Sequence, residues 1–362
     1  MRRSTVLVVV ALVLGLACQM AFAAGGGEAV KGEMEVVAVM YGHANEGTWD
    51  PSAYAGLLKA QAKTPFKLSL SEGTSTQDVE KVLRNWASRG VSVIFAHSDI
   101  YLEQVLTVAK QFPKTNFIGE LQLDPALNPN DPDIGKFAPD KMPPNVVMAG
   151  DTPYEGNYMA GYVAAMMSKT NKLGVLQPFE APPLNRYSNC FYYGAKAAKP
   201  NIELQVVFVG DYIAPAETRD AVKSLAKNGC DVIFTEMDDN SAILEAAAQG
   251  IRIIPMYMDK LDVDPNAVIT SVVMDWSGPL GGAIEATAKG KFAEYRSKLY
   301  FNPLGVKDGS IYLGKWGNNV PDSVKKAATD LLKKRLGEMG IRIRDAAPGY
   351  YERDVHQQPR DQ

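Results

Sequence analysis

Cysteine and histidine are scarce in this chain of 362 residues, which has three of each. Past the N-terminal apolar segment the cysteines are Cys190 and Cys230, which are too few for a disulfide framework, and their pairing is left open. The histidines, His43, His97 and His356, form no cluster with metal-ligand spacing. The sequence therefore predicts no metal centre.

An excess of charge of either sign is also missing. The 38 Lys and Arg residues nearly balance the 41 Asp and Glu residues, and the net charge is −3. A protein that binds nucleic acid through its phosphates needs a concentrated positive charge. We therefore expect no nucleic acid partner. The 46% hydrophobic and 22% charged content is typical of a globular protein.

The sequence motifs of common nucleotide-dependent and hydrolytic enzymes are absent. The chain has no G-x-x-x-x-G-K-[ST] phosphate loop, no G-x-S-x-G elbow and no H-E-x-x-H pair. The glycines of residues 278–282 lack the strand and helix context of a dinucleotide site. No Ser or Cys nucleophile is spaced to work with His43 or His97. We therefore expect a protein that holds a ligand, without a cofactor, rather than an enzyme.

The N-terminus has the three parts of a secretory signal peptide. Arg2 and Arg3 precede the apolar residues 5–17, and the small residues of 21–23 offer a cleavage site. The apolar run is shorter than the roughly 20 residues that cross a bilayer as a helix. We therefore expect residues 1–24 to be a signal peptide and the protein to be periplasmic or on the cell surface.

Cys18 leaves two interpretations of this leader open. It follows Leu16 and Ala17, as in a lipoprotein processing site, although Gly15 stands where such sites usually carry Leu. A lipid at Cys18 would be the chain's only link to the membrane. Cys18 is otherwise discarded with the signal peptide, and the following glycines form a flexible leader.

The rest of the chain alternates between short apolar strands and helices. Such alternation is typical of parallel βαβ units, and predicts an α/β protein. The predicted strands are residues 35–41, 67–70, 91–96, 116–119, 146–149, 173–177, 204–209, 231–235, 252–257 and 268–273. The predicted helices are residues 52–62, 76–89, 102–111, 155–168, 186–198, 218–228, 241–249, 281–288 and 323–339.

This series is too long for one hydrophobic core, so we expect two doubly wound parallel-sheet lobes joined by a hinge. The first lobe is expected at residues 34–152 together with about 275–300. The second is expected at residues 153–273 together with about 301–345, and residues 346–362 form a tail.

Ligands of parallel sheets bind beyond the carboxyl ends of the strands, so the residues that follow the strands are the candidates. In the first lobe Trp49 offers a flat apolar face and Asp50 a neighbouring carboxylate. The alternative is that Trp49 plugs the end of the lobe core and Asp50 caps a helix.

In the second lobe the corresponding candidates are Tyr212, Asp238, Asp239 and Asp259. Tyr212 is equally compatible with a surface turn. Helix capping is the favoured role for Asp238 and Asp239, because a helix is predicted from residue 241. Asp259 is expected to accept hydrogen bonds from a ligand, with a structural salt bridge as the alternative.

Several motifs together resemble the basic membrane protein (BMP) family of substrate-binding proteins of ABC importers. The clearest are the helix start YEGNYMAG at residues 154–161 and the helix motif at 189–201. Three further segments, residues 47–50, 212–217 and 258–259, resemble ligand-proximal segments of the family. The resemblance covers most of residues 34–300, and it implies a type I periplasmic-binding fold and purine bases or nucleosides as ligands.

The resemblance also implies a set of ligand-binding residues. Trp49 and Tyr212 would sandwich the ring of the ligand. The polar edge and any ribose would be read by Asn45, Asp50, Glu155, Asn189, Asp239 and Asp259. The family usually has Trp at position 212 and Asp at position 214, whereas this chain has Tyr212 and Ala214, so the exact ligand is left open.

The partners that the resemblance implies are a small-molecule ligand and an ABC transporter permease, with the protein itself a monomer. Two other classes of function remain open. One is an exported nucleoside-processing hydrolase that uses carboxylates of the cleft. The other is a receptor for a different small ligand, such as a sugar or an amino acid, or a surface receptor without a transport partner.

Overall fold

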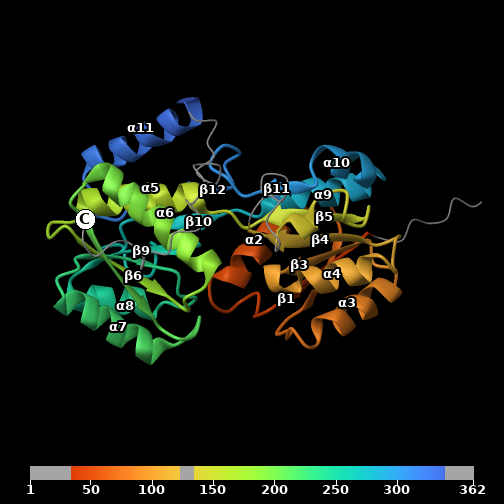
Figure 1. Ribbon diagram of the computed structural model, residues 1–362, viewed down its shortest axis with the longest axis horizontal. Helices are drawn as coiled ribbons and strands as arrows, with labels where there is room; N and C mark the ends of the chain where they lie inside the picture. Colours follow the sequence, from red (N-terminus) through yellow and green to blue (C-terminus); the bar gives the residue numbers. More distant parts are fainter. Residues whose placement is uncertain (1–33, 123–133, 339–362) are drawn as a thin grey trace, which may run out of the picture. The chain divides into compact units, whose positions relative to one another are not determined.

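The computed structural model describes residues 34–122 and 134–338 (Figure 1). The predicted signal peptide with Cys18, and the tail at 346–362, lie outside these residues. The described chain forms two six-stranded sheets with helices between successive strands. The predicted α/β fold of two parallel-dominated lobes is confirmed.

The first sheet has the strand order β11-β5-β4-β3-β1-β2, with parallel pairing throughout. The chain crosses the sheet in one direction from β1 to β2 and in the other from β2 to β3. Because both crossovers are right-handed, the helix of the first connection and the helix of the second lie on opposite faces of the sheet. Its strands are β1 (Glu35–Met40), β2 (Lys67–Ser71), β3 (Val93–His97), β4 (Asn116–Leu121), β5 (Val146–Gly150) and β11 (Phe301–Pro303). Its helices are α2 (Trp49–Lys63), α3 (Val79–Ser88), α4 (Leu102–Ala109), α9 (Ser277–Ala288) and α10 (Phe292–Lys298), with the 3₁₀ turns η1 (Asp99–Tyr101) and η2 (Gly135–Phe137).

The second sheet has the order β12-β10-β9-β8-β6-β7 and differs in one strand, because β12 runs antiparallel to β10. Its strands are β6 (Lys172–Gln177), β7 (Glu203–Phe208), β8 (Val232–Thr235), β9 (Arg252–Tyr257), β10 (Val272–Met274) and β12 (Ile311–Leu313). Its helices are α5 (Tyr154–Met167), α6 (Pro182–Ala198), α7 (Pro215–Lys227), α8 (Ser241–Gln249) and α11 (Asp322–Glu338).

Most predicted elements have a counterpart within a few residues. The predicted strand at 268–273 is shorter than expected, since β10 covers Val272–Met274 and Val268 contributes an isolated bridge to Ile253. Three short elements, α10, β11 and β12, are missing from the prediction because none carries a long apolar pattern.

Three segments of the described chain connect the two sheets: residues 151–153, 275–276 and 304–310. The predicted division assigns residues from about 301 to the second lobe. In the structure β11 pairs with β5 of the first sheet, and the crossing to β12 follows it. Strand pairing therefore places this crossing a few residues later than the sequence suggests.

One surface ion pair and one buried hydrogen bond anchor the crossing at residues 275–276 to helix α2. Lys59 Nζ lies 2.6 Å from Asp275 Oδ2, and Trp276 Nε1 donates to Ser52 Oγ at 3.0 Å. Trp276 is fully buried, and a Cβ on Gly56 would come within 2.6 Å of the Trp276 Cβ. Gly56 therefore lets α2 approach the crossing closely.

Glycines also allow α5 and α6 to pack at close range. A Cβ on Gly161 would lie 1.7 Å from the carbonyl oxygen of Phe191, and one on Gly194 would lie 1.8 Å from that of Tyr158. Neither position tolerates a side chain without separating the helices. This pair holds α6, and the polar residues it carries, against the second sheet.

No helix in residues 34–122 or 134–338 combines the length and the apolarity that crossing a membrane requires.

Candidate functional site

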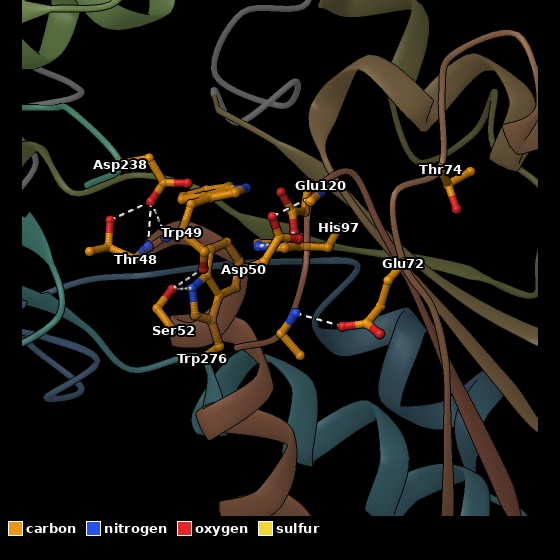
Figure 2. Close-up of polar contacts among 12 residues, drawn as sticks. Thr48, Trp49, Asp50, Ser52, Glu72, Thr74, His97, Glu120, Asp238 and Trp276 are labelled. Carbon is orange, nitrogen blue, oxygen red and sulfur yellow. Dashed lines mark hydrogen bonds and ion pairs between the residues drawn. The ribbon is translucent and has the colours of Figure 1, made fainter. Parts of the chain in front are cut away.

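The carboxylate of Asp238 links the second sheet to the first residues of α2. Its Oδ1 accepts hydrogen bonds from Thr48 N and Thr48 Oγ1, both at 2.5 Å, and from Trp49 N at 2.8 Å (Figure 2). These N–H groups stand at the start of a helix, where no intrahelical acceptor exists and negative charge is stabilised. Asp238 follows β8, so an acceptor from the second sheet caps a helix of the first.

Trp49 stands at the centre of a cluster of rings drawn from both sheets. Its indole is stacked on the imidazole of His97, with centroids 4.6 Å apart and an interplanar angle of 14°. Trp276 meets it edge-on at 5.5 Å, and Tyr257 of β9 meets it edge-on at 5.3 Å. Trp49 itself is only half-buried, so part of its surface remains accessible.

His97 is held between two carboxyl groups beneath this indole. Its Nδ1 contacts Glu120 Oε1, and its Nε2 lies 4.0 Å from Asp50 Oδ1 (Figure 2). Asp50 Oδ2 accepts from the backbone N–H of Gly42 at 3.0 Å. Burial lowers the pKa of His97, opposed by the Asp50 carboxylate, and burial raises the pKa of Asp50 and that of Glu120.

A second cluster of polar side chains lies around α6. Tyr187 donates to Asp151 Oδ2 at 2.5 Å, and Ser188 donates to Glu236 Oε1 at 3.0 Å. Gln177, at the end of β6, reaches the other Glu236 oxygen at 3.4 Å. Burial raises the pKa of Asp151 and that of Glu236 well above their ordinary values. The side chains of these five residues are almost entirely removed from water.

Several buried polar atoms of these two groups have no hydrogen-bond partner among the residues that the structure describes. They are Asp50 Oδ1, His97 Nε2, Glu120 Oε2, Asp151 Oδ1 and Gln177 Oε1. Buried polar groups in folded proteins are nearly always paired with protein, water or a ligand. The oxygens among them are hydrogen-bond acceptors, and Nε2 of His97 donates or accepts according to its tautomer. No group of three His, Cys, Asp or Glu residues within the described ranges is arranged to hold a metal ion.

Tyr257 is the β9 residue that reaches this site. Its φ of 79° lies in the left-handed region, which costs a non-glycine residue energy and is found at functional positions. It is buried, and burial raises its pKa well above the ordinary tyrosine value. The unusual backbone turns the Tyr257 ring toward Trp49 at the end of the strand.

Trp49 and Asp50, which are adjacent in the sequence, both lie against His97, and their role as ligand contacts stays a prediction. Asn45 and Tyr212 are more exposed. Asn45 is an exposed loop residue. Tyr212 is 40% exposed, its ring packs edge-on against Phe179 at 5.5 Å, and its carbonyl accepts from Asp238 N. Burial raises the pKa of Tyr212 to about 12. A sandwich between Trp49 and Tyr212 therefore stays a prediction.

Two other residues predicted to contact the ligand, Asp259 and Glu155, accept hydrogen bonds from backbone N–H groups. Asp259 Oδ1 accepts from Leu261 N and its Oδ2 from Lys315 N, so this carboxylate fixes the turn after β9. Glu155 Oε2 accepts from Val306 N at 2.9 Å, across the crossing between β11 and β12.

Asp239 accepts a backbone hydrogen bond, whereas the buried side chain of Asn189 makes none that the structure shows. Asp239 Oδ1 accepts from Ser241 N at 2.6 Å, which is the capping role expected for it. Capping of the same helix is also expected for Asp238, and this is corrected by its bonds to Thr48 and Trp49. Asn189 is buried in α6, and its side-chain nitrogen and oxygen are both unpartnered.

Sequence reasoning overlooked most of the buried polar residues. Gln177 and Tyr257 each end a predicted strand, and His97 and Glu120 each follow one directly. The signal was a polar or aromatic residue closing an apolar strand. Because ligands of parallel sheets are expected beyond the strands, Gln177 and Tyr257 are not candidates from the sequence, and His97 is one only as the partner of a nucleophile.

Comparison with known families identifies the class of the protein. The family model of Bmp, described as ABC transporter substrate-binding protein PnrA-like, matches residues 34–343. The chain belongs to the Bmp family. Substrate-binding proteins of ABC transporters bind small molecules outside the cytoplasm and interact with a permease, and this Bmp-family protein is one of them.

Relatives of this Bmp-family protein carry names that refer to different ligands. It is 26% identical to a purine-binding protein of Brucella abortus, over 75% of this chain and 71% of that protein. It is 23% identical to an ABC transporter nucleoside-binding protein of Lactococcus lactis, over 81% and 85% of the two chains. It is also 25% identical to a protein of Haloferax volcanii named for glucose binding, over 72% of this chain and 61% of that protein.

A solved structure supports the fold alone. The solute-binding protein of an ABC transporter system from Conexibacter woesei superposes with a TM-score of 0.70 at 21% identity, covering 88% of this chain and 99% of the other. The type I arrangement of two lobes is therefore shared by this Bmp-family protein and such receptors.

Proposed function

We propose that this ABC transporter substrate-binding protein binds a purine base or nucleoside between the carboxyl ends of its two sheets. The observation that carries the proposal is the position of Trp49, whose ring belongs to the first sheet's cluster while its N–H is bound by Asp238 of the second. A ligand stacked on Trp49 would be held where the two sheets already meet.

The chemistry around Trp49 suits a flat ligand with hydrogen-bond donors. Stacking a base on an aromatic side chain stabilises binding by about 1–3 kcal/mol. Unpartnered oxygens of Asp50, Asp151 and Glu120 would accept from amino, ring N–H or ribose hydroxyl groups. The names of two relatives, for purine and for nucleoside binding, support the same ligand class.

Binding and release, rather than turnover, is the proposed activity. Ligand contacts from both sheets favour the conformation in which the sheets meet, and the three crossing segments would serve as the hinge. The permease would then distinguish the loaded protein from the empty one. We propose a monomer, exported by residues 1–24, whose Cys18 decides between a lipid-anchored and a freely diffusing receptor.

Thermal denaturation with a panel of bases, nucleosides, sugars and amino acids tests the ligand class. A ligand at 100 times its Kd stabilises the folded state by about 2.7 kcal/mol. We expect a rise in Tm with a purine base or nucleoside and none with sugars. Stabilisation by a sugar alone, such as glucose, would overturn the purine assignment.

Calorimetric titration of Trp49→Ala tests the stacking role. We expect at least a tenfold weaker Kd for the best purine, since one stacked base contributes about 1–3 kcal/mol. Trp86→Ala is the matched control, because Trp86 packs under Arg89 and donates to Ser71 away from the site. Equal losses in the two variants would count against Trp49 as the stacking surface. Conversion of a labelled nucleoside by the wild type would contradict the proposed absence of turnover.

A further inference from the structure

The imidazole of His97 is the least expected member of the site. It is fully buried, stacked on Trp49, and meets Trp276 edge-on at 5.3 Å (Figure 2). The ring of Phe95 lies 5.3 Å from it in a tilted arrangement. Aromatic or aliphatic side chains would fill such a position without burying ring nitrogens. The polar ring therefore calls for a role beyond packing.

The edge of this ring is fixed by groups from two different elements. Glu120 of β4 contacts Nδ1, and Asp50 of α2 faces Nε2 at 4.0 Å. Glu120 and Asp50 each keep one oxygen without a donor, so the arrangement is not the most stable one available to the fold. What the contacts do achieve is to hold the imidazole in one plane. Asp151 and Asp238 are the further acidic groups whose charges act on it.

The plane of His97 in turn decides which face of Trp49 is accessible. The two rings are within 14° of parallel, so His97 covers one face of the indole. Tyr257 and Trp276 meet the indole at its edges, at angles of 75° and 85°. A planar ligand can therefore stack only on the face of Trp49 that points away from His97.

We propose that His97 is a positioning residue for ligand binding: anchored by Glu120, its flat ring sets the plane of Trp49 and reserves the opposite indole face for the ligand. This inference rests on the proposed function, in which the ligand stacks on Trp49. His97 acts through Trp49 and does not touch the ligand itself.

Two substitutions of His97 distinguish the effect of a flat ring from that of an apolar side chain without a ring. His97→Phe and His97→Leu both lose the Glu120 contact and both introduce an apolar side chain, but only Phe keeps a ring to lie against Trp49. With the best ligand of the thermal panel, of whatever class, we expect Kd to rise about fivefold in His97→Phe, which loses only the Glu120 anchor, and at least 50-fold in His97→Leu, which loses the flat ring as well. Equal weakening in both variants, or no weakening in either, would overturn the proposal.

A second pair tests the anchor and avoids any change to the ring. Glu120→Gln can still hydrogen-bond Nδ1, whereas Glu120→Leu cannot. We expect the Gln variant to bind within threefold of the wild type and the Leu variant to bind at least fivefold more weakly. If Glu120→Leu binds as tightly as Glu120→Gln, the anchoring step is wrong.

Near-ultraviolet circular dichroism gives a readout that needs no ligand. The signal of Trp49 is obtained by subtracting the spectrum of Trp49→Phe. We expect this signal to persist in His97→Phe and to collapse in His97→Leu, because an indole without a fixed plane loses its ellipticity. A Trp49 signal that is unchanged in His97→Leu would refute the positioning role. The spectrum decides the inference even if no compound of the panel binds, an outcome that would defeat the proposed function alone.

Discussion

Asp238 caps a helix to which it is not adjacent in the sequence: its Oδ1 lies 2.8 Å from the backbone nitrogen of Trp49, 189 residues earlier in the chain. The same Trp49 presents its ring to His97 and Tyr257. The contact that joins the two sheets and the aromatic surface proposed for the ligand therefore belong to one residue. Ligand binding and contact between the sheets should depend on each other.

Removing the Asp238 carboxylate should weaken ligand binding more than it weakens the fold. Asp238→Ala leaves Thr48 N, Thr48 Oγ1 and Trp49 N without their acceptor. Since a net hydrogen bond to a charged group stabilises by about 1.5–3 kcal/mol, we expect Kd to rise about 10- to 100-fold. Calorimetric titration with the best ligand measures this.

Asp239→Ala is the matched control for that experiment. It removes a neighbouring carboxylate that accepts from Ser241 N at the start of α8, within the second sheet's own lobe. We expect a loss of about 1 kcal/mol of stability with Kd unchanged within threefold. An equal rise of Kd in both variants would mean that the loop as a whole, and not the Asp238 link, supports binding.

A methyl group on Gly47 should disturb the same contact. Gly47 has a φ of 77°, and a Cβ there would lie 2.6 Å from Asp238 Oδ2. We expect Gly47→Ala to weaken ligand binding at least tenfold. Gly250→Ala is the control, because Gly250 has a φ of 69° but open space around its Cβ position. It should lose only about 1 kcal/mol of stability from the left-handed backbone and keep its affinity.

Two helical glycines should respond to alanine with opposite signs. Gly194→Ala places a methyl group 1.8 Å from the carbonyl oxygen of Tyr158, so we expect a loss of at least about 2 kcal/mol in the free energy of unfolding. Gly281 lies inside α9, and its added Cβ would make ordinary contact with Ala60 at 3.7 Å. Gly281→Ala should therefore gain about 0.5–1 kcal/mol. Urea unfolding measures both, and destabilisation by both would contradict the described packing.

Glu236 should make the ligand-free protein less stable as the pH rises. Burial raises its pKa in the folded state above the unfolded value, so its contribution is fully present below the unfolded pKa of about 4.3 and is lost as the pH rises through the folded pKa. Glu236→Gln mimics the protonated form. We expect the fall in unfolding free energy between pH 5 and pH 8 to be smaller in this variant than in the wild type.

Urea unfolding at the two pH values checks this expectation. Glu217→Gln is the control, because Glu217 is exposed on α7 and should leave the pH dependence of the wild type unchanged. If Glu236→Gln shows the full wild-type fall between pH 5 and pH 8, Glu236 is not protonated in the folded protein at pH 5.

The alternation of strands and helices was predictable because each element depends on residues that are close together in the sequence. Apolar runs such as residues 91–96 and helix boundaries such as Gly250 depend on neighbours a few residues away. Trp49 and Asp50 were also within reach of the sequence, since a loop after the first strand of a parallel sheet must lie at its carboxyl edge.

The roles of Asp259 and Asp238 were not predictable in the same way. Both carboxylates follow strands of the second sheet, and the sequence favours Asp259 as a ligand contact and Asp238 as a helix cap. The structure gives Asp259 two backbone N–H groups, one of them from Lys315, whereas Asp238 receives those at the start of α2. Partners so distant along the chain are set by the packing of the lobes.

The sequence by itself therefore determined the elements, the fold class and the membership of the Bmp family, because each rests on periodicity or on short motifs. Only the tertiary structure decided that His97 lies between Glu120 and Asp50 beneath Trp49. It also decided that Asp238 accepts from the backbone N–H of Trp49 at the start of α2. The physical reason is that a side chain's partner, its burial and its pKa depend on which strand ends meet in space.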